Sequence, residues 1–180
     1  SLFAFDRAAD EQAGGTPLSP LLAAYFLGRP ADAVPHVLSG ERPVWDDGEE
    51  RVIAAWALVA ADRDAALARI YLTRFGSVNA FARDLIWAAF ARGGWPTAAS
   101  MAVFALERNG HAGEARRLGD AVRRALTEDE ANGIARSEHA RTWAELHVRR
   151  GDRAAAVLEL ERAIDSDWQD VCAGPVWIGA

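Results

Sequence analysis

Apolar residues recur at helical spacing along most of the chain, and no segment alternates apolar and polar residues as a half-buried strand does. In the segment 51–60, Val52, Trp56 and Val59 follow one another at steps of four and three. Apolar residues also occupy most of the other positions of this segment, which is typical of a helix buried between neighbours. The pattern predicts an all-α fold.

The ends of the helices are marked by prolines, which a first helical turn tolerates, and by glycines, which can end a helix in the left-handed conformation. The segments 47–50 and 127–130 also have the spacing of capping boxes, which begin helices. Together these signals predict about nine or ten helices, at residues 1–10, 19–28, 30–39, 48–61, 63–75, 78–92, 96–109, 112–126, 129–150 and 152–166. Their short links favour a stack of antiparallel hairpins over a four-helix bundle. The longer link from Ser39 to Gly48 is predicted to be a surface loop.

Small residues that follow tight turns indicate an internal repeat. Ala156 lies five positions after Gly151, and a small residue is needed there because the two helices of a hairpin approach each other closely. Similar turns precede three alanines at a spacing of 33 residues, namely Ala33, Ala66 and Ala99. Ala115 also follows such a turn but is out of step with this spacing. It is therefore open whether the helix at 112–126 pairs with the preceding or the following helix.

The segment from Gly151 to Ile164 resembles the second half of a tetratricopeptide (TPR) repeat, which has a period of about 34 residues. The segment 5–9 is similar to the end of such a repeat, so the chain is expected to begin inside a hairpin of a longer protein. The resemblance implies a right-handed α-α superhelix of stacked antiparallel hairpins that spans residues 1–180 as a single domain. Residues 1–10 would be a truncated repeat end, and residues 167–180 an irregular C-terminal tail.

The same resemblance implies a non-catalytic scaffold that binds a peptide or a partner helix in a concave groove. Mapped onto this chain, the groove contains eight residues: Tyr25, Arg51, Asp84, Arg108, Glu138, Arg141, Glu145 and Arg149. Family members that hold the C-terminal carboxylate of chaperones use Lys, Arg and Asn, whereas this chain has no Lys and has Glu145 where Asn would be needed. The alternative is a regulatory or sensory repeat module of a larger bacterial transcription regulator or cyclase, because the segment 174–178 resembles the end of such arrays.

The composition removes several kinds of chemistry from this picture. All 20 basic residues are Arg, so no ε-amine is available for a phosphate-binding loop or a Schiff base. The net charge of -6 argues against direct nucleic-acid binding, and no apolar stretch is long enough to span a membrane. We expect a protein or peptide partner, no cofactor and no metal, and self-association is left open. The expected location is the cytoplasm of a bacterium, with the periplasm as the alternative because the chain does not begin with Met.

A few residues carry candidate chemistry, each with a structural alternative. His139 and His147 lie eight positions apart, which is roughly 12 Å along a helix axis and too far to share a metal ion. The acidic run 165–170 lacks the Gly and the distal Glu of a calcium loop, so a polar helix end is the favoured interpretation. Cys172 is the single cysteine, which excludes an internal disulfide, and it has no nearby His to activate it as a nucleophile.

Two further groups are candidates for contacts with a partner. One predicted helix carries a basic strip that consists of Arg116, Arg117, Arg123 and Arg124. The strip could bind phosphate or an acidic partner. The favoured interpretation is a solvated face whose charge is balanced by acidic neighbours. Among the seven Trp, three are expected in the core: Trp56, Trp87 and Trp143. Trp45 and Trp95 lie in or beside turns and are expected to make exposed contacts.

Overall fold

The computed structural model of the chain describes residues 19–39, 44–46, 48–82 and 94–165. All regular elements in these ranges are helices, and the described part contains no strand, which confirms the all-α prediction. The elements are α2 (Pro20–Phe26), α3 (Pro30–Leu38), α4 (Gly48–Ala60), α5 (Asp64–Ile70), a π-helical turn (Tyr71–Phe75), α6 (Val78–Ala82), α7 (Gly94–Arg108), α8 (Ala112–Ala131), a 3-10 turn (Arg136–His139), α9 (Ala140–Arg149) and α10 (Arg153–Asp165).

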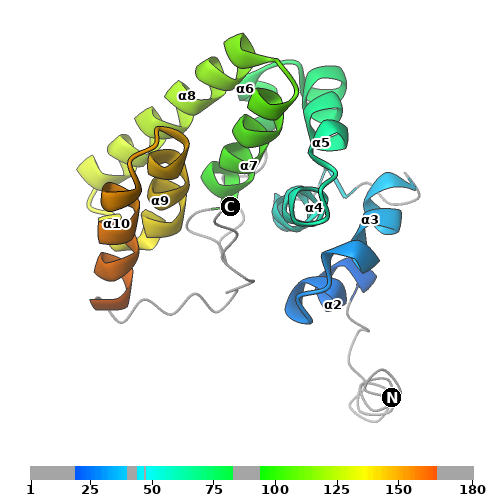
Figure 1. The fold of residues 1–180 in the computed structure, drawn as a ribbon, viewed down its shortest axis with the longest axis horizontal. Helices are drawn as coiled ribbons and strands as arrows, with labels where there is room; N and C mark the ends of the chain where they lie inside the picture. The colour runs from blue at the N-terminus through cyan, green and yellow to red at the C-terminus, as the bar shows by residue number, and fades with distance from the viewer. Residues whose placement is uncertain (1–18, 40–43, 47, 83–93, 166–180) are drawn as a thin grey trace.

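The packing of the helices follows their order in the chain, and they trace an arch in Figure 1. Consecutive helices pack together as α2 with α3, α4 with α5, α7 with α8, and α9 with α10; α3 also packs on α4, and α5 on α7, more extensively than α4 packs on α5. The first members of these pairs also contact one another in succession, from α2 to α4, from α4 to α7 and from α7 to α9. The helix α8 packs mainly on α7, so the helix predicted at 112–126 pairs with the preceding helix.

The small residues of the sequence repeat lie where helices approach closely. Ala33, Ala99, Ala115 and Ala156 are all buried, with 4% of their surface exposed or less, and Ala66 is half-buried. The backbone of α8 approaches α7 closely as well, because a Cβ added to Gly119 would lie 3.8 Å from the side chain of Val103. The burial of four of these five alanines agrees with the predicted close contacts, but Ala99 lies in α7, whereas Ala33 and Ala66 lie in the second helices α3 and α5.

The structure differs from the prediction at the junction of α8 and α9. The capping-box pattern at 127–130 does not begin a helix, because α8 continues through it to Ala131. The hydroxyl of Thr127 instead donates to the carbonyl oxygen of Arg123 at 2.9 Å, as threonines inside helices do. The chain leaves the helix at Gly133, whose φ is 89°. The single helix predicted at 129–150 is therefore wrong: the 3-10 turn and α9 replace it.

The link predicted as a surface loop is buried at two of its described residues. Val44 and Trp45 are 2% and 6% exposed, and the Trp45 ring packs edge-on against Phe75 with centroids 6.4 Å apart. Asp46 is exposed and pairs with Arg74 at 2.6 Å. The expectation that Trp45 makes an exposed contact is therefore wrong, because the apolar rings around it remove it from water.

Several predicted features lie outside the described residues. They are the helix at 1–10, the Asp84 and Trp87 positions, the tail at 167–180 with Asp167, Asp170 and Cys172, and the side chains of Trp95 and Glu138. Within the described ranges, none of the helices combines the length and the apolar character that a membrane crossing requires.

Candidate functional site

Three residues predicted for the groove lie together on α9, where this helix packs on α7. Arg141, Glu145 and Arg149 are four residues apart, so they share one face of the helix. This face is turned inward: Arg141 is 8% exposed, Glu145 is 9% exposed, and the side chain of Arg149 is 11% exposed. Charged side chains are rarely buried without partners that balance their charge. The partners of these three residues lie on α9 itself and on α7.

Glu145 is the anchor of this group. Its Oε1 accepts a hydrogen bond from Nε of Arg141 at 3.3 Å, and its Oε2 accepts one from the hydroxyl of Ser100 on α7. Both carboxylate oxygens are thus engaged, and the charge of Glu145 is balanced mainly by Arg141. The contact also fixes α9 against the middle of α7.

Arg149 is a buried cation with weaker compensation. Its guanidinium lies 5.3 Å from the centre of the Phe104 ring, and its nearest carboxylate in an ion pair is Glu107 at 4.0 Å, which is half exposed. Burial lowers the pKa of Arg149, and the charges of Glu145 and Glu107 only partly oppose that effect. An anion beside Arg149 would stabilise it.

A small, partly enclosed cavity lies between α4, α7 and α9. Its volume is about 10 Å³, and it is lined by Trp56, Val59, Met101, Glu145 and Arg149. That volume holds a single atom of the size of a water oxygen. Within the described part of the chain, two lining residues have a buried donor without a hydrogen-bond acceptor, Trp56 at Nε1 and Arg149 at Nη1, and so does Arg141 at Nη2, which does not line the cavity. We call Trp56, Ser100, Arg141, Glu145 and Arg149 the polar cluster.

The other described groove residues lie elsewhere. Tyr25 is 7% exposed and packs edge-on against Trp56, with ring centroids 5.0 Å apart. Arg51 is 2% exposed and donates to the backbone carbonyls of Trp45 at 2.8 Å and of Phe81 at 2.6 Å. These two residues therefore belong to the core and do not line an exposed groove. Arg108 is exposed, 3.8 Å from Asp64.

Sequence reasoning missed two members of the polar cluster. Trp56 was assigned to the core, which its 1% exposure confirms, but its unpaired N–H cannot be seen from periodicity. Ser100 had a signal that could have been used, because it is the single polar residue in the otherwise apolar segment 98–106 of α7. A buried hydroxyl requires a partner, and Glu145 provides it.

A second polar group, which we call the Arg136 network, joins the end of α8 to α9 and α10. Arg136 donates through Nη2 to Glu159 at 2.8 Å and through Nη1 to Glu130 at 3.0 Å. Its guanidinium lies 4.2 Å from the centre of the Trp143 ring, and Nε1 of Trp143 donates to Glu130 at 2.9 Å. Arg162 also donates to Glu159, at 2.6 Å. The network stabilises the α9–α10 hairpin.

The pKa values of this network follow from these contacts. Burial raises the pKa of Glu159, but the hydrogen bonds and charges of Arg136 and Arg162 outweigh it, so the net shift is downward. The hydrogen bond to Glu159 raises the pKa of Arg136 against the effect of burial. Both ions are therefore stabilised in their charged forms.

The two histidines singled out in the sequence are packing residues. His139 lies in the 3-10 turn with 2% exposure, and its Nε2 is 3.0 Å from a carboxylate oxygen of Asp129. The ring of His147 packs against Trp143 with centroids 6.1 Å apart. Among the described residues, no group of three or more His, Cys, Asp or Glu is arranged to hold a metal ion.

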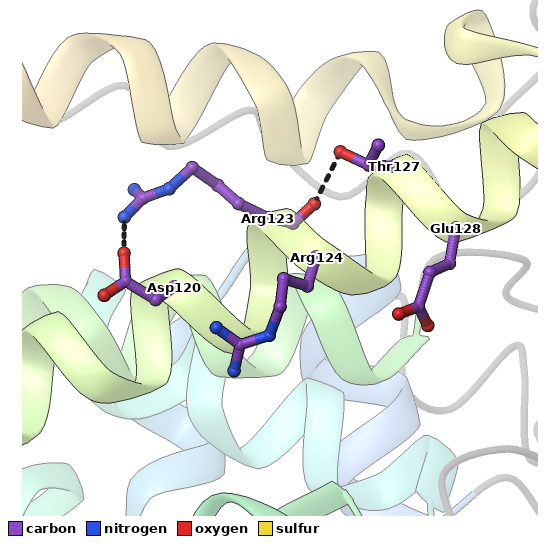
Figure 2. A pocket seen from close by; sticks show the side chains of 5 residues that line it. All are labelled: Asp120, Arg123, Arg124, Thr127 and Glu128. Atoms are coloured by element: carbon purple, nitrogen blue, oxygen red, sulfur yellow. Dashed lines mark hydrogen bonds and ion pairs between the residues drawn. The ribbon is translucent and has the colours of Figure 1, made fainter.

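The basic strip lies on the outer side of α8. Figure 2 shows its open pocket, which is lined by residues of α8 alone: Asp120, Arg123, Arg124, Thr127 and Glu128. Arg123 pairs with Asp120, and Arg117 pairs with Glu114 one turn away. Half of the positive charge of the strip is thus neutralised within the helix. This pairing favours the interpretation as a solvated face.

No protein-family model matches the chain, and no curated protein or solved structure matches it either. Its own residues and their geometry are therefore the basis for a function.

Proposed function

We propose that the chain is a non-catalytic interaction scaffold with a TPR-like arrangement of hairpins, and that it binds a peptide or a helix of another protein along α2, α4, α7 and α9. The observation that carries this proposal is the succession of contacts between these four helices. In helical repeat proteins, such a row of first helices forms the concave face on which partners bind.

The sequence repeat supports the same arrangement. In the second helices of the four hairpins, Ala33, Ala115 and Ala156 are buried and Ala66 is half-buried. Ala99 of the 33-residue spacing lies in the first helix α7 and does not fit this pattern. Stacked repeats of this kind bury a continuous core. In this chain the segment 53–59 of α4 is itself buried, so the accessible positions of the row include the C-terminal ends of α7 and α9.

The polar cluster supports a binding role for this face. It lies between α4, α7 and α9, and it contains buried donors that no described residue satisfies. Glu107 and Arg108 are exposed at the nearby end of α7, so the border of the cluster carries both signs of charge. A partner with mixed polarity would be complementary to it.

Site-specific photo-crosslinking in the native host tests the proposal. A photoreactive amino acid replaces Glu107, which borders the polar cluster, and in a matched control it replaces Arg124 on the outer side of α8. We expect a discrete crosslinked protein at position 107 and none at position 124. The purified partner should then bind the chain in solution, and Arg149→Glu should weaken that binding by about tenfold or more.

Two results would contradict the proposal. One is the absence of a crosslinked protein at position 107, and the other is the same set of products at both positions. Circular dichroism of each variant shows whether the helical fold is retained, so a folding defect is not mistaken for loss of binding.

A further inference from the structure

The buried donors around the α4–α7–α9 cavity lack a common acceptor. Trp56 is 1% exposed and lines the cavity, and its indole N–H has no acceptor among the described residues. The same holds for Nη1 of Arg149, which also lines the cavity, and for Nη2 of Arg141, whose Nε is bonded to the lining residue Glu145. A buried donor without an acceptor is unfavourable, and the two on lining residues, Trp56 and Arg149, indicate an occupant of the cavity.

The charges at the cavity indicate that the occupant is anionic. Arg141 and Arg149 bring two positive charges, and Glu145 brings one negative charge that Arg141 and Ser100 already engage. The remaining ion-pair partner of Arg149 is Glu107, which is half exposed and 4.0 Å away. A neutral water molecule would leave the charge of Arg149 in place and could accept from only two donors, whereas a carboxylate offers about four acceptor sites.

The size of the cavity selects among anions. About 10 Å³ accommodates one oxygen atom, and the cavity is only partly enclosed, so the rest of a carboxylate can remain at its opening. A chloride ion is larger than an oxygen atom. A phosphate could also insert one oxygen, but its charge of about −2 exceeds the single positive charge of Arg149. A carboxylate is the anion that matches the donors, the charge and the volume together.

We propose that this cavity binds the carboxylate of an Asp or Glu side chain of the partner, so that an acidic residue in the middle of a segment is the specificity determinant. This inference rests on the proposed function and names the chemistry that its binding face recognises. Trp56 and Arg149 donate directly to the carboxylate, and Glu145 holds Arg141 and α9 in position beside it.

A titration followed by NMR tests the site without knowledge of the partner. The probe is the indole N–H signal of Trp56 in the 15N-labelled chain, assigned by triple-resonance experiments among the seven Trp. Sodium acetate should move this signal downfield with saturation in the millimolar range. Sodium chloride at the same ionic strength should leave it in place.

Two short peptides separate the sources of the carboxylate. The first carries one Glu in the middle of an alanine sequence with both ends blocked, and the second carries Gln there and a free C-terminal carboxylate. We expect the first peptide to move the Trp56 signal and the second to have at least about tenfold weaker effect. A response to the second peptide alone, an equal response to chloride, or no response to any probe overturns the inference.

Two matched variants test whether the shift of the Trp56 signal depends on Arg149. Arg149→Gln should weaken acetate binding by about tenfold or more, because a charged hydrogen bond is lost. Arg108→Gln is the control, since Arg108 lies over the same Phe104 ring at 5.4 Å but does not line the cavity. Equal weakening in both variants contradicts the assignment. The titration of the unmodified chain decides the question even if Arg149→Gln fails to fold.

The crosslinking and NMR experiments test the proposed function and the carboxylate site separately. A partner crosslinked at position 107 together with a silent Trp56 signal overturns the carboxylate site and leaves the scaffold standing. A saturable acetate response without any crosslinked partner supports the site and contradicts the scaffold.

Discussion

Arg51 and Arg136 both join parts of the chain that are distant in sequence, but they use different acceptors. Arg51, in the N-terminal half, is 2% exposed and donates to the backbone carbonyls of Trp45 and Phe81. The side chain of Arg136, in the C-terminal half, is 32% exposed and donates to the carboxylates of Glu130 and Glu159. Each guanidinium also lies over an aromatic ring.

The kind of acceptor determines how the stability of each region responds to mutation. Neither backbone carbonyl can be protonated, and both are buried with Arg51, so removal of this side chain leaves two acceptors unsatisfied. The carboxylates of the Arg136 network can be protonated, and the partial exposure of Arg136 screens their attraction. The N-terminal half should therefore depend strongly on its arginine, and the C-terminal hairpin should depend moderately on its network, in a pH-dependent way.

The largest effect is expected from Arg51→Met. This substitution keeps most of the apolar stem but removes both hydrogen bonds, and we expect the free energy of unfolding to fall by roughly 3 kcal/mol. Urea unfolding followed by circular dichroism measures it. The control is Arg74→Met, which breaks the exposed pair with Asp46 and should cost less than about 1 kcal/mol. Equal effects in the two variants would show that burial does not distinguish these arginines.

A smaller effect is expected from Glu159→Gln, which weakens the Arg136 network. Glu159 is 5% exposed and accepts from Arg136 and Arg162, so we expect a loss of about 1–2 kcal/mol, limited by the exposure of the two arginines. Glu161→Gln on the exposed side of α10 is the matched control and should be nearly neutral. If Glu159→Gln is also neutral, the network does not stabilise the hairpin.

The sequence was sufficient where one local pattern decides the structure. The helical period predicted the helices. The alanines after the turns predicted buried positions, because two helices that approach each other closely need a small side chain between them. It failed at Thr127, since a hydroxyl followed by acidic residues can either begin a helix or bond back within one. Only the packing of α8 on α7 decides between these two outcomes.

For the site, the sequence identified the shared face of α9 but not its environment. The four-residue spacing of Arg141, Glu145 and Arg149 was visible, whereas their burial depends on Ser100, which is 45 residues from Glu145. Arg51 was assigned to the groove by mapping the family resemblance onto the chain, and a charge is indeed rarely buried without partners. Its acceptor on Phe81 lies 30 residues away, so no local pattern could show that the charge is satisfied inside the core.

The smallest predicted effect is the pH dependence of the Arg136 network. The net effect of its surroundings lowers the pKa of Glu159: burial raises it, but the hydrogen bonds and charges of Arg136 and Arg162 outweigh burial. A carboxylate with a lowered pKa contributes stability that is fully present above the unfolded value, about 4.3, and is lost as the pH falls through the folded value. The cost of Glu159→Gln should therefore shrink between pH 6 and pH 3, whereas the cost of Glu161→Gln, on the exposed side of α10, should stay near zero. Urea unfolding of both variants and the parent chain at constant ionic strength measures this. A pH-independent cost for Glu159→Gln, or an equal change for Glu161→Gln, would show that Glu159 does not make the stability of the hairpin depend on pH.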